Sequence, residues 1–408
     1  MGYLLRLAAR NVTRNPRRSI LSALAIVIAL VMIVFAQGWL RGILGDISDN
    51  TARLRTGHVR IARSEYLRRE RLLPLSEAMK LGPETAAMLD EDPEVAAWAP
   101  RIRFGVMLNN RETSLAAIGL AVDPGREEDI LRLAPTVAAG SYFTGEEDIL
   151  LGRELADRLG LAAGDTLVLI TQTAHMSATG ANLVVRGVLN TGIAQIDRNH
   201  FFITLARAQD LLDLEGRASE VVVMLADPGR AEAVATRFGT RLADPEAEAR
   251  PWTSEGIIGY IRMANTTYFI MYLVILLVAC SAIVNTMMMV VFERTREIGT
   301  MRALGMSRAA VVGALVLEAG LIGLGGSAIG TGLGAGLTAL AQAQGIDVRV
   351  MTQNEVNPAL MQGVIYPELT VAAVVISMVM GIGLSLLVGF FASRRAAKLS
   401  PAEALRTM

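Results

Sequence analysis

Four long apolar runs constrain the fold of this chain more than any other feature. About 20 consecutive apolar residues in a helix cross a bilayer, and the chain holds four runs of that length or more: residues 19–40, 263–292, 309–341 and 369–393. The third run includes one acid, Glu318, and the other three carry no formal charge. We therefore expect four transmembrane helices, with the long segment 41–262 between the first two.

Basic residues are concentrated at one side of these runs, and the connection 342–368 on the other side holds only Arg349. Arg6, Arg10, Arg14, Arg17 and Arg18 precede the first run, Arg294, Arg296, Arg302 and Arg308 lie between the second and third, and Arg394, Arg395, Lys398 and Arg406 follow the fourth. Short loops rich in Lys and Arg remain in the cytoplasm. This pattern predicts that both termini, the segment 293–308 and the tail 394–408 are cytoplasmic. The domain 41–262 and the loop 342–368 are then expected outside.

The first 18 residues form a pattern typical of a helix lying on a membrane surface. Arg6, Arg10 and Arg14 recur every four residues, with apolar residues on another face. We expect residues 1–18 to form an amphipathic elbow helix before the first transmembrane helix. The alternative is a simple arginine cluster that stops translocation.

The segment 41–262 mixes short strand and helix patterns. Strands are predicted, from β-branched content and bounding Gly, Asp or Asn, at residues 57–62, 102–108, 165–171, 182–189, 200–204 and 220–225. Helices are predicted at 152–161, 205–216 and after 227. The irregular order indicates an α+β domain. Its length suits two subdomains, the inner one at about residues 135–213. The fold class is thus four transmembrane α-helices with a large α+β domain between the first and second.

Small residues repeat every four positions in the last two runs. They are Gly326, Gly330 and Gly334 in the third run, and Ser377, Gly381, Ser385 and Gly389 in the fourth. Such spacing lets helices approach closely in lipid. The repeats predict helix-packing positions, either within this chain or at a seam between two copies.

Signatures of catalysis are missing from the sequence. It has no HExxH and no GxSxG motif, and neither lysine, Lys80 or Lys398, belongs to a phosphate-binding GxxxxGK[ST] loop. Net charge is zero, which gives no pull toward nucleic acid. Two acid clusters receive structural interpretations: residues 144–148 cap a turn, and residues 125–129 open a helix over 130–133. We expect a non-catalytic chain without a metal site or a cofactor of its own.

The segment 293–308 is dense in charge, although it lies between two apolar runs. Ile298, Met301 and Leu304 or Gly305 recur at helical spacing, and the surrounding charges are Glu293, Arg294, Arg296, Glu297 and Arg302. A short helix with an apolar ridge can insert into a groove of a soluble partner, and Gly305 would end it. The alternative is a solvated turn held by local Glu–Arg pairs.

Three stretches carry a family resemblance. "ERTREIGTMRALGMSR" (293–308), the glycine-rich "EAGLIGLGGSAIG" (318–330) and the closing "RRAAKLSPAEALR" (394–406) resemble the FtsX-like permeases of ABC transporters. The architecture of one span, a large outer domain and three further spans is similar too. Among these permeases, the lipoprotein-releasing LolC/LolE type is the most similar in length. The residues "ERTREIG" (293–299) resemble the macrolide-exporter MacB type.

The resemblance implies a mechanism called mechanotransmission in the bacterial inner membrane. A separate LolD-like ATPase would bind ATP and Mg, dock on the coupling helix 293–308 and move the periplasmic domain. The resemblance further implies a second permease copy or paralogue, a lipoprotein or other envelope cargo, and a periplasmic carrier or adaptor. Cargo would enter laterally beside residues 27–39 and 268–285. Efflux of antibiotics or peptides, or regulation of an envelope enzyme, are the alternatives; the sequence identifies no cargo-binding residue.

Overall fold

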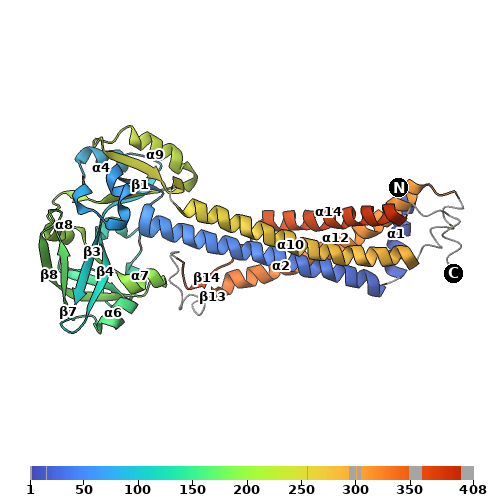
Figure 1. Cartoon of the computed structure of the whole chain (residues 1–408), viewed down its shortest axis with the longest axis horizontal. Coiled ribbons are helices and arrows are strands. Elements are labelled where there is room, and N and C mark those ends of the chain that lie inside the picture. The colour runs from blue at the N-terminus through green and yellow to red at the C-terminus, as the bar shows by residue number, and fades with distance from the viewer. Residues whose placement is uncertain are drawn as a thin grey trace. The chain divides into compact units, whose positions relative to one another are not determined.

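The structure is a computed structural model that describes residues 2–14, 16–254, 256–293, 300, 305–348 and 361–396. Within these ranges, four helices are long and apolar enough to cross a membrane. They are α2 (Pro16–Thr51), α10 (Gly256–Glu293), α12 (Arg308–Gln344) and α14 (Val371–Ala396), and the shorter α1 (Gly2–Arg14) precedes them (Figure 1). The prediction of four transmembrane helices is confirmed.

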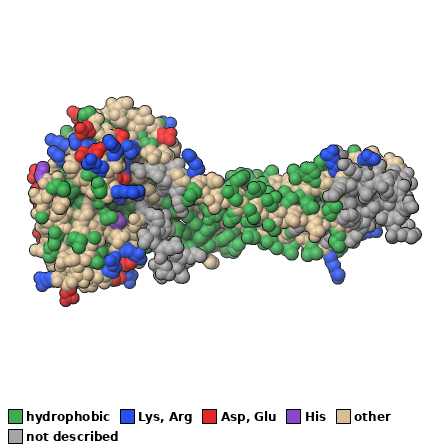
Figure 2. Space-filling model, in the orientation of Figure 1, with side chains coloured by type: hydrophobic (Ala, Val, Ile, Leu, Met, Phe, Trp, Pro, Cys, Tyr) green, Lys and Arg blue, Asp and Glu red, His purple; other side chains and the backbone are tan. Residues whose placement is uncertain are grey.

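The chain divides into two compact units, a helical unit within residues 1–43, 262–346 and 365–408, and a sheet unit within residues 44–261 and 347–364. Hydrophobic side chains gather over the long helices, whereas charged side chains are concentrated on the sheet unit (Figure 2). In the helical unit, Ile26, Leu30 and Ile33 of α2 form a buried cluster with Ala319 and Val388. This distribution is what a bilayer around the helices requires.

Helix α2 is longer than a membrane crossing. Its 36 residues span about 54 Å at 1.5 Å per residue, against about 30 Å of hydrocarbon. It continues directly into a π-helical turn, η1 (Ala52–Thr56), and ends at Gly57, whose φ of 64° favours glycine. One unbroken helix therefore leaves the membrane span and enters the sheet unit.

The sheet unit is built on one ten-stranded sheet. Its strand order is β12 (Ala247–Pro251), β1 (Val59–Arg63), β11 (Glu220–Leu225), β3 (Val95–Asn109), β4 (Ser114–Val122), β9 (His200–Thr204), β6 (Asp148–Gly152), β8 (Ala178–Leu189) and β5 (Val137–Gly140), with β7 (Thr166–Gln172) between β3 and β8. The pairs β4–β9 and β6–β8 are parallel and the others antiparallel. Two small sheets pair β2 (Met79–Lys80) with β10 (Arg217–Ala218), and β13 (Ile346–Asp347) with β14 (Val364–Ile365).

Helices cover different parts of this sheet. They are α3 (Ser64–Arg68), α4 (Pro83–Asp90), α5 (Pro124–Glu127), α6 (Arg153–Leu159), α7 (Ala194–Asn199), α8 (Leu205–Leu212) and α9 (Ala231–Gly239). Short 3-10 turns occupy Glu70–Leu72 (η2), Leu75–Glu77 (η3), Ala134–Thr136 (η4), Pro228–Arg230 (η5) and Trp252–Ser254 (η6).

The sheet carries separate hydrophobic cores. One joins Val59 and Val223 to Phe238 of α9, and a larger one joins Phe104 and Phe201 to α6 and α8. The first core draws on both ends of the segment and the second on its middle. The observed α+β domain confirms the predicted fold class, while the subdomain boundary near residues 135–213 stays a prediction.

All six predicted strands are present, as β1, β3, β7, β8, β9 and β11. The predicted turn at residues 144–148 is also present, because the Asp148 carboxylate accepts hydrogen bonds from the backbone N–H groups of Thr144 and Gly145, both at 2.7 Å. The predicted helix over residues 130–133 is wrong. Helix α5 starts earlier, capped by Asp123, and Glu127 turns inward to a buried arginine instead of facing the helix dipole.

Candidate functional site

Most of the predicted coupling segment lies outside the described residues. Arg294, Arg296, Glu297, Ile298, Met301, Arg302 and Leu304 belong to that part. At its borders, Glu293 ends α10, and Gly305 has a φ of 95°, a left-handed conformation that favours glycine. Ser307 then caps α12 by accepting a hydrogen bond from the N–H of Ala310 at 3.2 Å. These contacts show where α10 ends and α12 begins, and the coupling role of the segment between them stays a prediction.

The predicted elbow helix corresponds to α1. The side chains of Arg6, Arg10 and Arg14 are exposed, while Ala8 is completely buried. The Ser19 hydroxyl at the start of α2 donates to the carbonyl of Val12 at 3.1 Å. This arrangement ties the amphipathic helix to the first membrane helix.

The predicted packing residues line contacts inside this chain. A Cβ added to Gly326, Gly330 or Gly334 of α12 would lie within 3.1 Å of α2 atoms. In α14, a Cβ on Gly381 would meet Ser327 and one on Gly389 would meet Ala319, while Ser377 and Ser385 are buried. The five glycines and Ser385, which lies against Gly323, are therefore where helices α2, α12 and α14 approach each other.

The end of α2 is joined to the sheet by buried charges that the sequence interpretation missed. Arg101 of β3 and Glu127 of α5 are both fully buried and form a bidentate ion pair at 2.6 and 2.9 Å. Arg101 also donates to the backbone carbonyl of Arg53 in η1 at 2.7 Å, and Arg53 pairs with Asp49 one turn earlier in α2. One guanidinium thus connects the helix end, the central strand β3 and α5.

A second ion cluster lies beside the same turn. Arg60 of β1 is buried and pairs with Glu220 at 2.6 Å and with Glu70 at 3.2 Å. Arg55 of η1 pairs with Glu70 at 3.2 Å, and Arg103 lies within 3.6 Å of both acids. An arginine inside a strand pattern, such as Arg60 in "VRIAR", is the local sequence signal that could have indicated this cluster. Its partner Glu220 lies 160 positions away along the chain.

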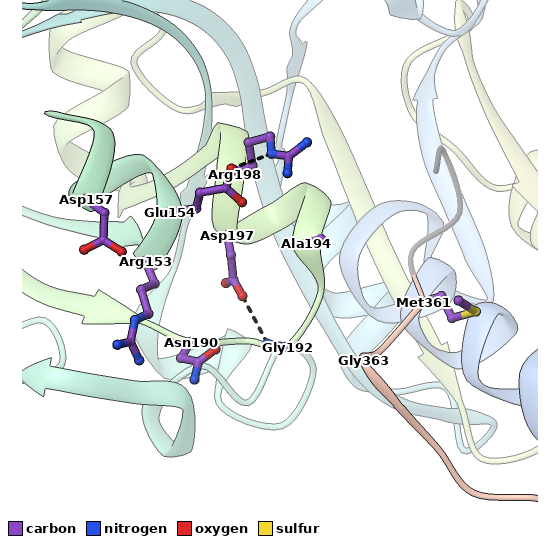
Figure 3. Close-up of a pocket in the computed structure, with 10 residues that line it drawn as sticks. All are labelled: Arg153, Glu154, Asp157, Asn190, Gly192, Ala194, Asp197, Arg198, Met361 and Gly363. Carbon is purple, nitrogen blue, oxygen red and sulfur yellow. Dashed lines mark hydrogen bonds and ion pairs between the residues drawn. The ribbon is translucent and has the colours of Figure 1, made fainter. Parts of the chain in front are cut away.

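The segment between α12 and α14 is also attached to the sheet unit. The N–H of Gln362 donates to the Asp46 carboxylate of α2 at 2.8 Å, and the N–H of Gly363 donates to the Gly192 carbonyl at 3.0 Å. Figure 3 shows the pocket of about 270 Å³ beside this contact, with Asp197 directed at Gly192. Burial raises the pKa of Asp197 although hydrogen bonds from Thr191 and Gly192 oppose the rise.

An apolar groove opens on another part of the sheet unit. Its volume is about 810 Å³, and its lining includes Leu72, Met107, Ile170 and Met176. Leu72 of η2 is 77% exposed, and Met176 at the turn between β7 and β8 is 76% exposed. Exposed apolar side chains around a groove mark an interaction surface. In the described part of the chain, no group of three His, Cys, Asp or Glu side chains could hold a metal ion.

Comparison with known proteins agrees with this architecture. The family model described as "MacB-like periplasmic core domain" matches residues 19–241, and "FtsX-like permease C-terminal" matches residues 269–401. The lipoprotein-releasing system transmembrane protein LolC of Xylella fastidiosa (strain Temecula1) is 27% identical over 363 residues, which cover 83% of this chain and 86% of that protein.

Two further relatives have different names. The lipoprotein-releasing system transmembrane protein LolE of Haemophilus influenzae is 26% identical, and the aligned residues cover 78% of this chain and 79% of that protein. The macrolide export ATP-binding/permease protein MacB of Hahella chejuensis is 25% identical, and the aligned residues cover 70% of this chain but 40% of that protein. Together with the four membrane-capable helices and the α+β domain between the first two, these matches show that this chain belongs to the FtsX-like ABC transporter permeases with a MacB-like periplasmic core domain.

Proposed function

We propose that this chain converts ATP-driven motion of a separate cytoplasmic ATPase into movement of its periplasmic domain. The chain itself carries no phosphate-binding loop, so the nucleotide and Mg belong to the partner. The ATPase docks on segment 293–308, and a second permease, identical or paralogous, completes the assembly. The chain lies in the inner membrane of a bacterium, with both termini in the cytoplasm.

One observation carries this proposal: α2 continues directly into η1, and the buried guanidinium of Arg101 in β3 donates a hydrogen bond to the η1 backbone at Arg53. A helix that ended at the membrane surface could not push or rotate a domain. Because Arg101 holds the η1 backbone to β3 and α5, we infer that a tilt of α2 moves the sheet. Interfaces of this kind switch between discrete packings rather than deform gradually.

We propose lipoproteins as the cargo. Support comes from the names of the relatives LolC and LolE, which align over most of this chain. Helix α10 leaves Phe269, Leu273 and Leu277 exposed, as a helix that contacts acyl chains from the bilayer would. The similarity to MacB favours a second candidate, export of a drug or peptide with a periplasmic adaptor. Mass spectrometry of acylated proteins that co-purify with the chain separates the two.

We also propose that the apolar groove near Met176 binds the soluble carrier that receives the cargo. A carrier that accepts acyl chains exposes apolar surface of its own when it is empty. The groove offers a matching apolar surface in the periplasmic domain.

A charge reversal tests the coupling role. The double variant Arg296→Glu, Glu297→Arg is co-expressed with a LolD-like ATPase, and Arg241→Glu, an exposed change on the periplasmic domain, serves as the control. We expect co-purification of the ATPase and cargo-stimulated ATP hydrolysis to fall at least tenfold in the double variant and to persist in the control. Unchanged assembly and hydrolysis in the double variant would count against the proposal.

A further inference from the structure

A small cavity opens where η1, η2 and the strands β3, β4 and β9 meet. Its volume is about 230 Å³, and the charged residues that line it are Arg55, Arg71, Arg103 and Glu70. All of them belong to the sheet unit. Its lining residues lie between Leu54 and His200 of the chain, so an inference about this cavity goes beyond the proposed function, which concerns the membrane helices and their drive.

Positive charge exceeds negative charge around the cavity. The acids Glu70 and Glu220 are shared among three guanidinium groups, those of Arg55, Arg60 and Arg103. Three positive and two negative charges leave one positive charge, and the exposed Arg71 adds another. Burial acts to raise the pKa of Glu70, but the charges of Arg60, Arg55 and Arg103 outweigh burial and lower that pKa. Glu70 therefore stays ionised, and its negative charge is already included in this count.

The imidazole at the cavity does not change this balance. His200 is 7% exposed, and its burial, followed by the charge of Arg103, lowers its pKa to about 4. The ring is neutral at pH 7, and Nδ1 lies 3.2 Å from the carbonyl of Gln195, to which it donates. The buried Oε1 of Gln195 accepts no hydrogen bond from any described residue. The Gln195 oxygen can therefore accept a hydrogen bond from a hydroxyl group in the organic part of a ligand, but not from a phosphate oxygen.

The rest of the wall is apolar and includes a strained residue. Leu54, Leu120 and Ile196 line it together with Leu73, whose φ of 48° and ψ of 56° place a leucine in the left-handed region. Strain of this kind concentrates at binding sites. A site with excess guanidinium charge next to an apolar wall suits an oxyanion that carries a short organic part.

We propose that this cavity binds a phosphate group carrying a glycerol-sized organic part, held by Arg71 together with Arg55 and Arg103. The ligand would join η1, η2 and β3, and would so stabilise the attachment of α2 to the sheet. Both a soluble phosphate ester and a phospholipid headgroup present this chemistry.

Arg71 provides a test variant because no ion pair within the described residues involves it. Its removal subtracts a ligand contact without leaving a buried acid unpaired. The matched control is Arg68→Gln on α3, where Arg68 is exposed and, among the described residues, pairs with Glu65 one turn away. In the full-length protein in a neutral detergent, binding of glycerol 3-phosphate is measured at constant ionic strength by calorimetry and by the shift of the thermal midpoint.

We expect saturable stabilisation of the wild type and of Arg68→Gln, and at least fivefold weaker binding by Arg71→Gln. A parallel series in nanodiscs with and without phosphatidylglycerol identifies the source. Arg71-dependent stabilisation by the soluble ester alone indicates a soluble ligand, and stabilisation by the lipid alone indicates a headgroup. No Arg71-dependent effect in either series, or equal losses in Arg71→Gln and Arg68→Gln, would overturn the proposal.

Discussion

At the scale of single residues, the attachment of the membrane helix depends on charges removed from water. Arg101 and Glu127 are both 0% exposed. Such a pair contributes little net stability against an apolar replacement, but loss of one partner costs about 3–5 kcal/mol because the other charge is left buried and unpaired. The pair fixes the Arg101 guanidinium in place, and displacement of η1 from β3 would break the hydrogen bond that this guanidinium donates to the Arg53 carbonyl.

Met176, at the turn between β7 and β8, tests the carrier surface. Met176→Asp places a charge at the exposed turn between β7 and β8, and Ala233→Asp places the same charge on the exposed face of α9 as a control. Since a carboxylate in an apolar interface stays without a partner, we expect Met176→Asp to slow release of a triacylated lipoprotein to a soluble carrier about tenfold. ATP hydrolysis and the control should be unaffected. Equal release by the two variants would rule out the groove as the carrier site.

At the scale of helices, close approach of α12 to α2 depends on glycine. A Cβ on Gly330 would lie 2.9 Å from Val27 Cα, whereas a Cβ on Gly332 meets nothing within 4 Å. We expect Gly330→Ala to lower stability by about 1–3 kcal/mol through overpacking. Gly332→Ala should be neutral or mildly stabilising, because alanine is the better helix former. Thermal unfolding in detergent measures both, and similar midpoints would contradict the packing role of this glycine repeat.

The elements that could be predicted from the sequence are those with a strong signal within a short stretch of residues. β11 ("EVVVML") is β-branched, and the glycine repeats of α12 follow helical spacing. Strand β4 ("SLAAIGLAV") was missed because Ala and Gly have low strand propensity. It forms through pairing with β3 and β9, and Gly119 leaves room for the perpendicular rings of Phe104 and Phe201, 5.9 Å apart.

The candidate site followed the same division. The coupling and elbow segments have charge patterns that can be seen in a short stretch of sequence. The link between Arg101 and Glu127 joins a strand to a helix after an intervening hairpin strand, and the partner of Arg60 is 160 positions away. No periodicity encodes contacts of that range, so the junction at the end of α2 became evident only from the fold.

At the scale of the whole molecule, the proposed function makes this chain a lever that a partner ATPase drives. Each unit has its own packing, and α2 supplies a covalent, helical link that leaves the membrane and ends inside the sheet unit. A break in that helix should uncouple ATP hydrolysis from movement of the periplasmic domain, while the fold of each unit stays intact.

The most direct measurement is therefore made on a Gly-Gly insertion after Gly45 in α2, where the surroundings of the glycine are open. A Gly-Gly insertion after Arg111, in the exposed β3–β4 turn, is the control. In proteoliposomes with the ATPase, we predict that the α2 insertion keeps ATP hydrolysis and loses lipoprotein release at least tenfold, while the control retains both. Release at the wild-type rate by the α2 insertion would contradict the lever.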